Sequence, residues 1–138
     1  MYRIIYVMVM ITWWSTFFYC LQQCETANEK DPTQAIGDGG DSIGPYQIQL
    51  SYWQDAVEYD SNIGGEYEDC KGFEYSQKVI RAYMQRYALD KGIVDPVKMA
   101  RIHNSGPKGY KKNVSVEYGR KFSDLWHQFY LNDEVLKQ

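Results

Sequence analysis

The chain contains few cysteines, and this limits how its fold can be stabilised. Its 138 residues include only three, Cys20, Cys24 and Cys70. A small secreted domain built on a disulfide framework carries more cysteines, usually in even number. A chain of this length can bury one hydrophobic core without such crosslinks. We therefore predict a single domain held by packing, with either one disulfide between Cys24 and Cys70 or three free thiols.

Positive charge and metal-ligand spacing are also missing. The formal net charge is -3 at pH 7, and no basic stripe runs along the chain, so a nucleic acid partner is not expected. The only basic cluster is local, at Lys108, Lys111 and Lys112. His103 and His127 stand far from each other and match no zinc-site spacing. We predict no metal and no cofactor.

An uncharged apolar run from Ile4 to Cys20 follows Arg3 at the N-terminus. One basic residue before such a run is typical of a secretory signal, and the run is slightly short for a membrane span. We therefore predict a signal peptide at residues 1–20, a domain at 21–138, secretion, and no stable membrane partner after processing. No small residues mark a cleavage site near Cys20. A first core helix and an incorrect start of the sequence are the alternatives.

Hydrophobic spacing and helix-breaking residues predict the other elements. Apolar residues recur at helical spacing in two segments, and a proline after an aspartate opens another helix. Alternating polarity predicts one short strand. The polar tail from Leu131 is expected to fray. The predicted helices are Tyr52–Tyr59 with Ser51 as its N-cap, Phe73–Leu89, Pro96–His103 and Val116–Phe129, and the predicted strand is Tyr46–Leu50.

A glycine-rich turn is the most informative segment. Residues 37–45 hold four glycines and one proline, which excludes a regular helix or strand interior and indicates a tight, pre-shaped turn. The turn carries Asp38 and Asp41, and Glu25 lies upstream on an expected helix end. Two separated carboxylates on different elements are what cleavage of a glycosidic bond requires. We predict Glu25 as the general acid and Asp38 as the second carboxylate.

Less specific interpretations of these carboxylates remain open. Glu25 by position alone fits a surface glutamate at a helix end, and Glu29 is the fallback acid. Aspartate before glycine commonly tightens a turn, so Asp38 can serve the backbone as well as the chemistry. Asp41 is a weaker alternative for the second carboxylate.

Several motifs in a fixed order resemble the invertebrate-type (destabilase-like) lysozymes. They are Glu25, Asp31-Pro32, residues 37–40, 43–48, 52–56, 83–87 and 100–109. The resemblance implies an α+β, mainly helical lysozyme-like fold with a small β-hairpin flap beside an active-site cleft. It also implies a secreted, monomeric enzyme that hydrolyses β-1,4 bonds of bacterial peptidoglycan or binds chitooligosaccharides. The chain departs from the family in its few cysteines and in the residues that follow Glu25 and Asn104.

Other residues of these motifs are candidate sugar contacts. Aromatic faces stack on sugar rings, and amide or hydroxyl groups bond to sugar hydroxyls. The candidates are Ser42, Tyr46, Gln47, Tyr52, His103 and Asn104, with Trp53 assigned rather to core packing. Two other functions remain open. One is a non-catalytic sugar-binding module. The other is an isopeptidase, which the resemblance also implies and which needs contact between Ser42 and His103.

Overall fold

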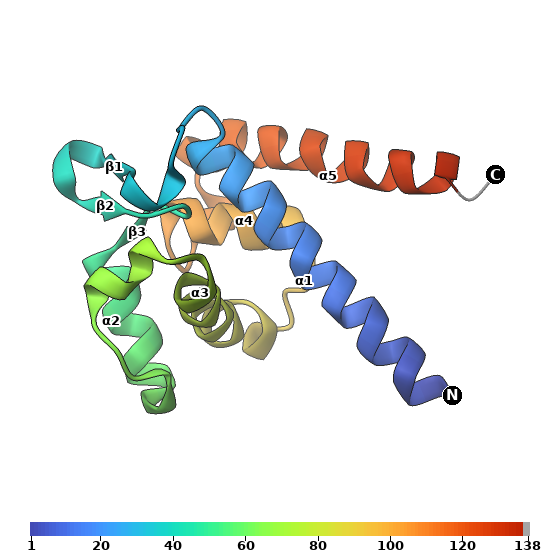
Figure 1. The fold of residues 1–138 in the computed structure, drawn as a ribbon, viewed down its shortest axis with the longest axis horizontal. Coiled ribbons are helices and arrows are strands. Elements are labelled where there is room, and N and C mark those ends of the chain that lie inside the picture. The colour runs from blue at the N-terminus through green and yellow to red at the C-terminus, as the bar shows by residue number, and fades with distance from the viewer. Residues whose placement is uncertain (137–138) are drawn as a thin grey trace.

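A helical body and a small sheet make up the fold. The computed structural model describes the backbone of residues 1–136 and the side chains of residues 1–129. The described α-helices are α1 (Tyr2–Thr26), α2 (Leu50–Tyr59), α3 (Phe73–Tyr87), α4 (Pro96–Ser105) and α5 (Val116–Leu136). The strands are β1 (Ile36–Gly37), β2 (Ser42–Ile43) and β3 (Ile48–Gln49). The sheet lies at one end of the body, and α1 crosses in front of α4 toward it (Figure 1). The predicted mainly helical α+β fold is confirmed.

The sheet is an antiparallel meander in the order β1-β2-β3. Ile43 of β2 pairs with Ile36 on one side and with Ile48 on the other. The turn before β2 has positive φ angles from Asp38 to Gly40. Gly44 has φ +76°, and a Cβ there would overlap the carbonyl oxygen of Cys70. The glycine-rich segment is thus the tight turn that the sequence predicts.

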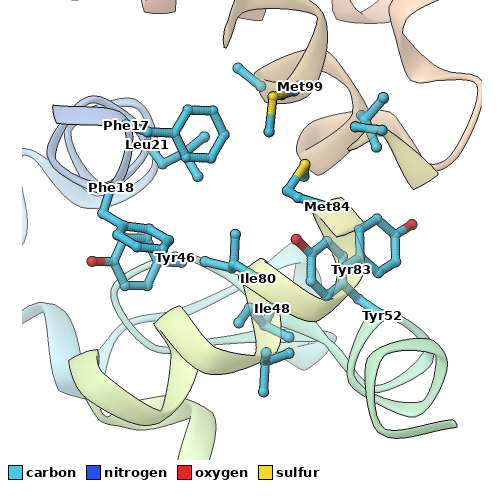
Figure 2. Packing of buried hydrophobic residues seen from close by; sticks show 14 of the residues in the cluster. Phe17, Phe18, Leu21, Tyr46, Ile48, Tyr52, Ile80, Tyr83, Met84 and Met99 are labelled. Atoms are coloured by element: carbon cyan, nitrogen blue, oxygen red, sulfur yellow. The ribbon is translucent and has the colours of Figure 1, made fainter. Parts of the chain in front are cut away.

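Helix α3 lies at the centre of the core. Its buried face packs against α2 and α4, and α1 packs against α5. Figure 2 shows aromatic and aliphatic side chains from these elements meeting around Ile80 and Met84, and both are fully buried. Phe17 and Leu21 of α1 are also fully buried in this cluster. The core therefore depends on the N-terminal helix.

Helix α1 has two halves with different environments. The apolar side chains from Ile4 to Ile11 are between 41% and 68% exposed, whereas Trp14, Phe17, Phe18, Cys20 and Leu21 are buried. Within the described residues, α1 is the one helix long and apolar enough to cross a membrane, on length and composition alone. A leader that ends at Cys20 stays a prediction, but its removal would take four of these five side chains out of the core.

Several element boundaries differ from the prediction. The predicted strand Tyr46–Leu50 is shorter, at Ile48–Gln49, and helix α4 ends at Ser105 instead of His103. Helix α2 begins at Leu50, and its N-cap is Gln49 without a side-chain hydrogen bond, so Ser51 is not the cap. Helix α3 ends at Tyr87 instead of Leu89. Helix α5 continues to Leu136, so the predicted end at Phe129 is wrong; no glycine or proline interrupts residues 131–136, and residues 137–138 of the predicted tail lie outside the described residues. Helix α4 begins at Pro96 as predicted, where Asp95 caps the amides of Val97 and Lys98.

The candidate disulfide is not formed, because Cys24 and Cys70 are free thiols, like Cys20. Cys24 faces α5, where its carbonyl accepts a hydrogen bond from Lys121. Cys70 is buried beside the start of α3, where its carbonyl accepts from Ser76. Burial raises the pKa of each of these two thiols to about 12, which disfavours the reactive thiolate.

Candidate active site

A cleft of about 480 Å³ lies where the helical body meets the sheet. It is lined by residues from several elements between positions 25 and 107. They are the end of α1 (Glu25), the sheet with its turns (Asp38, Ser42, Gln47, Gln49), helices α2 and α3 (Ser51, Tyr52, Asp55, Tyr83) and the end of α4 with the following turn (residues 103–107). The lining is mainly polar, and it includes both predicted catalytic carboxylates.

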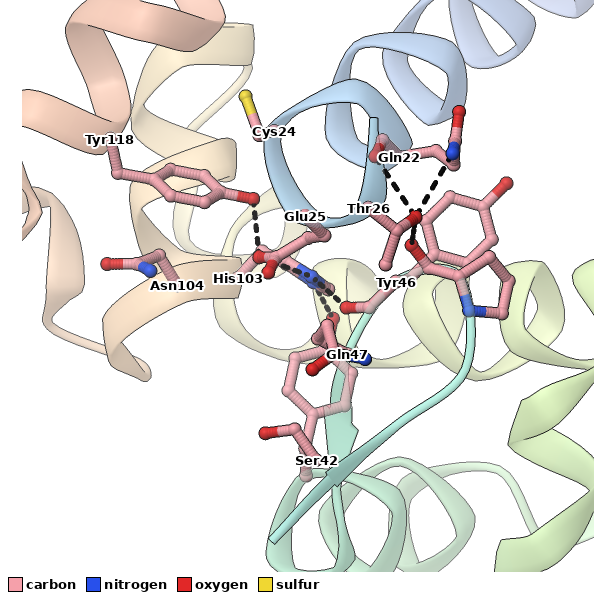
Figure 3. Close-up of polar contacts among 12 residues, drawn as sticks. Gln22, Cys24, Glu25, Thr26, Ser42, Tyr46, Gln47, His103, Asn104 and Tyr118 are labelled. Atoms are coloured by element: carbon pink, nitrogen blue, oxygen red, sulfur yellow. Dashed lines mark hydrogen bonds and ion pairs between the residues drawn. The ribbon is translucent and has the colours of Figure 1, made fainter. Parts of the chain in front are cut away.

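Glu25 is largely buried on the last turn of α1, with 17% of its side chain exposed. Its Oε1 accepts a hydrogen bond of 2.8 Å from the hydroxyl of Tyr118 on α5 (Figure 3). Burial raises the pKa of Glu25 from 4.5 to about 7. The hydrogen bond from Tyr118 and the charge of Lys121 oppose this rise, whereas the charge of Asp38 adds to it. Near neutral pH a large fraction of Glu25 therefore carries a proton.

Asp38 has a different environment at the tip of the β1–β2 turn. It is exposed, and its Oδ2 accepts a hydrogen bond of 2.5 Å from the hydroxyl of Ser42. Its backbone has φ +53°, a conformation that aspartate tolerates better than most residues. Its charge acts on Glu25, as expected for two groups that line the same cleft. The site therefore pairs a buried carboxyl with a solvated one.

His103 of α4 lies beneath these groups and is buried. Its Nε2 lies 2.9 Å from the backbone oxygen of Tyr46, which can only accept, so Nε2 carries the hydrogen. Nδ1 then accepts from the hydroxyl of Tyr52 at 3.0 Å. Burial lowers the pKa of His103 to about 4, so the ring is neutral near pH 7. Its Nε2 lies 3.7 Å from Glu25 Oε1, and at that pH the contact is not an ion pair.

Most of the predicted site residues meet in the cleft. Its lining includes Glu25, Asp38, Ser42, Gln47, Tyr52, His103 and Asn104. Tyr46 does not line it: its side chain is in the core, 2% exposed, and its hydroxyl accepts from Gln77. The expectation that Tyr46 contacts sugar is therefore not supported. Trp53 packs against the cluster, as expected, and its indole donates to Tyr75.

The alternative catalytic residues predicted from the sequence are not supported by the structure. Glu29 and Asp41 are exposed and do not line the cleft. Ser42 donates its hydrogen bond to Asp38, and both ring nitrogens of His103 have other partners. The Ser42–His103 contact that an isopeptidase would need is therefore not formed.

Tyr118 is the main residue that the sequence analysis missed at the site. Its spacing in the last helix places it on the apolar face, where it reads as a core residue. It lies 93 residues from Glu25, so no local motif connects the two. Asp55 and Tyr83 also line the cleft without having been singled out. A hydrogen bond between distant helices has no signal in one sequence.

Residues 16–125 match the family model described as Destabilase. Over 83 residues the chain is 34% identical to Lysozyme 1 of Crassostrea virginica, which covers 59% of this chain and 43% of that protein. Over 79 residues it is 35% identical to the lysozyme of Ostrea edulis, with 56% and 55% covered. The chain thus spans about half the length of these relatives. Over 111 residues it is 32% identical to invertebrate-type lysozyme 6 of Caenorhabditis elegans, with 72% and 79% covered.

Two solved structures resemble the fold over most of its length. One is the Meretrix lusoria lysozyme in complex with Aeromonas hydrophila PliI, with a TM-score of 0.65 and 26% sequence identity. The similarity covers 79% of this chain and 87% of that one. The other is the Tapes japonica lysozyme, with a TM-score of 0.61, 26% identity, and 80% and 85% covered. Sequence and structure therefore point to the same group of proteins.

Proposed function

The chain belongs to the destabilase family of invertebrate-type lysozymes, and on this premise we propose that it is a glycoside hydrolase that cleaves β-1,4 bonds of bacterial peptidoglycan. One observation carries the proposal. Glu25, with a pKa of about 7, and the exposed Asp38 line one cleft. Two carboxyl groups in such contrasting environments can act as acid and anion at the same pH.

In the proposed reaction Glu25 donates its proton to the glycosidic oxygen. The bond between that oxygen and the anomeric carbon breaks, and its electron pair stays with the oxygen of the leaving sugar. Asp38 stabilises the positive charge that develops at the anomeric carbon, or attacks that carbon. Water then adds to the anomeric carbon and gives a proton to Glu25, which restores the acid and frees Asp38. The hydrogen bond from Ser42 holds the Asp38 carboxylate in place.

Neutral polar groups of the cleft are suited to sugar recognition. Gln47, Gln49 and Asn104 line it, and amides can bond to both hydroxyl and N-acetyl groups. Gln47 has φ +51°, and its Nε2 donates to the carbonyl of Gly44 at 2.9 Å, which fixes the direction of its side chain. We propose that these amides orient the glycan, which is peptidoglycan or a chitooligosaccharide.

The test is Glu25→Gln, which keeps the shape of the side chain but cannot donate the acid proton. We expect clearing of a bacterial cell-wall suspension to fall about 10²–10⁴-fold, the usual contribution of a general acid. Glu29→Gln is the matched control, since Glu29 is exposed and outside the cleft. Full activity of folded Glu25→Gln would exclude Glu25 as the acid. Wild-type protein that binds chitooligosaccharide without turnover would support a non-catalytic sugar-binding module instead.

We further propose that the protein is secreted, and that any cleavage of a leader occurs before Trp14. The continuous run of exposed apolar residues in α1 ends at Ile11, and Trp14, Phe17 and Phe18 belong to the core. N-terminal sequencing of protein secreted from a eukaryotic host expressing the full chain tests this. A mature start at Leu21 would contradict the proposed boundary.

A further inference from the structure

The two oxygens of Glu25 have different surroundings. Oε1 accepts the hydrogen bond from Tyr118 and lies 3.7 Å from the ring nitrogen of His103. Oε2 has no hydrogen-bond partner among the described residues. Every buried side-chain oxygen of these residues does have a partner, so Oε2 is not a buried oxygen. Oε2 is therefore accessible to solvent, and Glu25 reaches solvent through the cleft that it lines. One oxygen is held by the protein, and the other is free to meet a ligand.

A protonated carboxyl group is not symmetric. Its carbonyl oxygen is a good acceptor, whereas the oxygen that carries the proton acts mainly as a donor. A donor fixed at Oε1 therefore favours the proton on Oε2. Figure 3 shows the Tyr118 hydroxyl directed at Glu25 from the side of α5. Helices α1 and α5 pack together, which fixes the relative positions of the two residues.

We propose that Tyr118 is a positioning residue that keeps the transferable proton of Glu25 on the oxygen that faces the cleft. The inference rests on the proposed hydrolase function. When Oε2 gives its proton to the glycosidic oxygen, Glu25 becomes a carboxylate. The hydrogen bond from Tyr118 then joins a charged acceptor and becomes stronger. Tyr118 thus stabilises Glu25 most in the state that follows proton transfer.

No other described group around Glu25 takes this role. His103 on α4 gives its N–H to the carbonyl of Tyr46, and Lys121 on α5 donates to the carbonyl of Cys24. The other titratable groups that interact with Glu25 through their charges are Cys24 of α1, Tyr52 of α2 and Asp38 of the β1–β2 turn. Among the described residues, Tyr118 alone donates a hydrogen bond to the carboxyl group.

The test is Tyr118→Phe, which removes the hydroxyl and keeps the ring. A hydrogen bond to a charged group is worth enough to move a pKa by about one unit, so the pKa of Glu25 should rise by that amount. The alkaline limb of the kcat/KM profile should move upward by about one pH unit, and kcat should fall about tenfold. Tyr75→Phe is the matched control, because Tyr75 donates a structural hydrogen bond to Gly64 outside the cleft.

Two readouts separate this inference from the proposed function. NMR titration of carboxyl-labelled glutamate reports the pKa of Glu25 whether or not the protein turns over a substrate. An unchanged Glu25 pKa in folded Tyr118→Phe overturns the inference, as does an alkaline limb that coincides with that of Tyr75→Phe. Wild-type protein with no turnover at any pH would overturn the hydrolase proposal, while the titration still decides whether Tyr118 controls the protonation of Glu25.

Discussion

Glu25 is placed where its ionised form is poorly solvated. Burial raises its pKa to about 7, and a group that holds its proton more tightly in the folded state destabilises the fold once it ionises. The feature that makes Glu25 a usable acid near neutral pH is therefore also a source of instability. The destabilisation caused by ionised Glu25 can be measured by substituting this one residue.

We predict that Glu25→Gln gains stability relative to the wild type as the pH rises. Between pH 4.5 and about 7 the folded state binds the Glu25 proton more tightly than the unfolded state does. The wild-type protein therefore loses the stabilisation that this tighter proton binding gives as the pH rises through that window. The variant does not lose it, because glutamine does not titrate. The difference between variant and wild type should grow by about 3 kcal/mol from pH 4 to pH 8, measured by urea unfolding.

Glu29→Gln supplies the control for this measurement, since Glu29 is an exposed glutamate outside the cleft. His103 contributes in the opposite direction, because its lowered pKa stabilises the fold at higher pH and loses that effect as pH falls below 6.5. His103 is present in both proteins, so its contribution enters the comparison only through its contact with Glu25. A difference that stays constant from pH 4 to pH 8 would refute the raised pKa of Glu25.

At the scale of elements, local signals predict well what local interactions determine. The start of α4 follows from Asp95 and Pro96, whose capping and fixed φ act within one turn. The turn before β2 follows from glycine. The environment of Tyr46 does not follow from its sequence neighbours, since its side chain packs against Phe18 of α1 and Phe73 of α3.

Helix α1 is a clearer case of burial that does not follow from the local sequence. From Ile4 to Cys20 its composition is that of a signal sequence, so the sequence alone cannot distinguish the residues of this run that the core uses. The structure distinguishes them by burial, with Val7 54% exposed and Phe17 completely buried. Phe17 stacks on Trp13 and contacts the ring of Phe122 on α5. The second half of α1 therefore belongs to the folded domain.

We predict that Phe17→Ala lowers the free energy of unfolding by about 3–5 kcal/mol, as for a large aromatic side chain removed from a packed core. Val7→Ala on the same helix should change it by less than about 0.5 kcal/mol, because Val7 is exposed. Urea unfolding of both variants, made in the full chain, measures the difference. Equal effects would mean that the two halves of α1 contribute alike.

At the scale of the whole molecule, the cleft combines segments between residues 25 and 107. The sequence predicts both carboxylates and most of the polar lining, because these residues lie in the motifs of the resemblance. It does not predict Tyr118, whose hydrogen bond to Glu25 depends on how α5 packs against α1. The two carboxylates of the proposed reaction are thus easier to predict from the sequence than Tyr118, which acts on one of them through a hydrogen bond.

Net charge is the property of the whole molecule that bears on its proposed substrate. The chain carries -3 at pH 7, and bacterial envelopes are anionic, so long-range repulsion opposes their encounter. Salt screens this repulsion, since the Debye length falls from about 30 Å at 0.01 M to about 8 Å at 0.15 M. We predict that clearing of bacterial cells accelerates roughly two- to fivefold over this range. Hydrolysis of a neutral chitooligosaccharide should not change.

A charge-reversed variant makes this prediction specific. Glu29 and Glu74 are exposed and lie outside the cleft, and changing both to lysine in the full, uncleaved chain makes its net charge positive. Clearing by Glu29→Lys/Glu74→Lys should then slow with added salt, because screening now weakens an attraction. If wild-type clearing also slows with salt, the local cluster of Lys108, Lys111 and Lys112 governs the encounter instead of the net charge. Long-range repulsion would then not control the encounter, whereas the chemistry proposed for Glu25 and Asp38 would be unaffected.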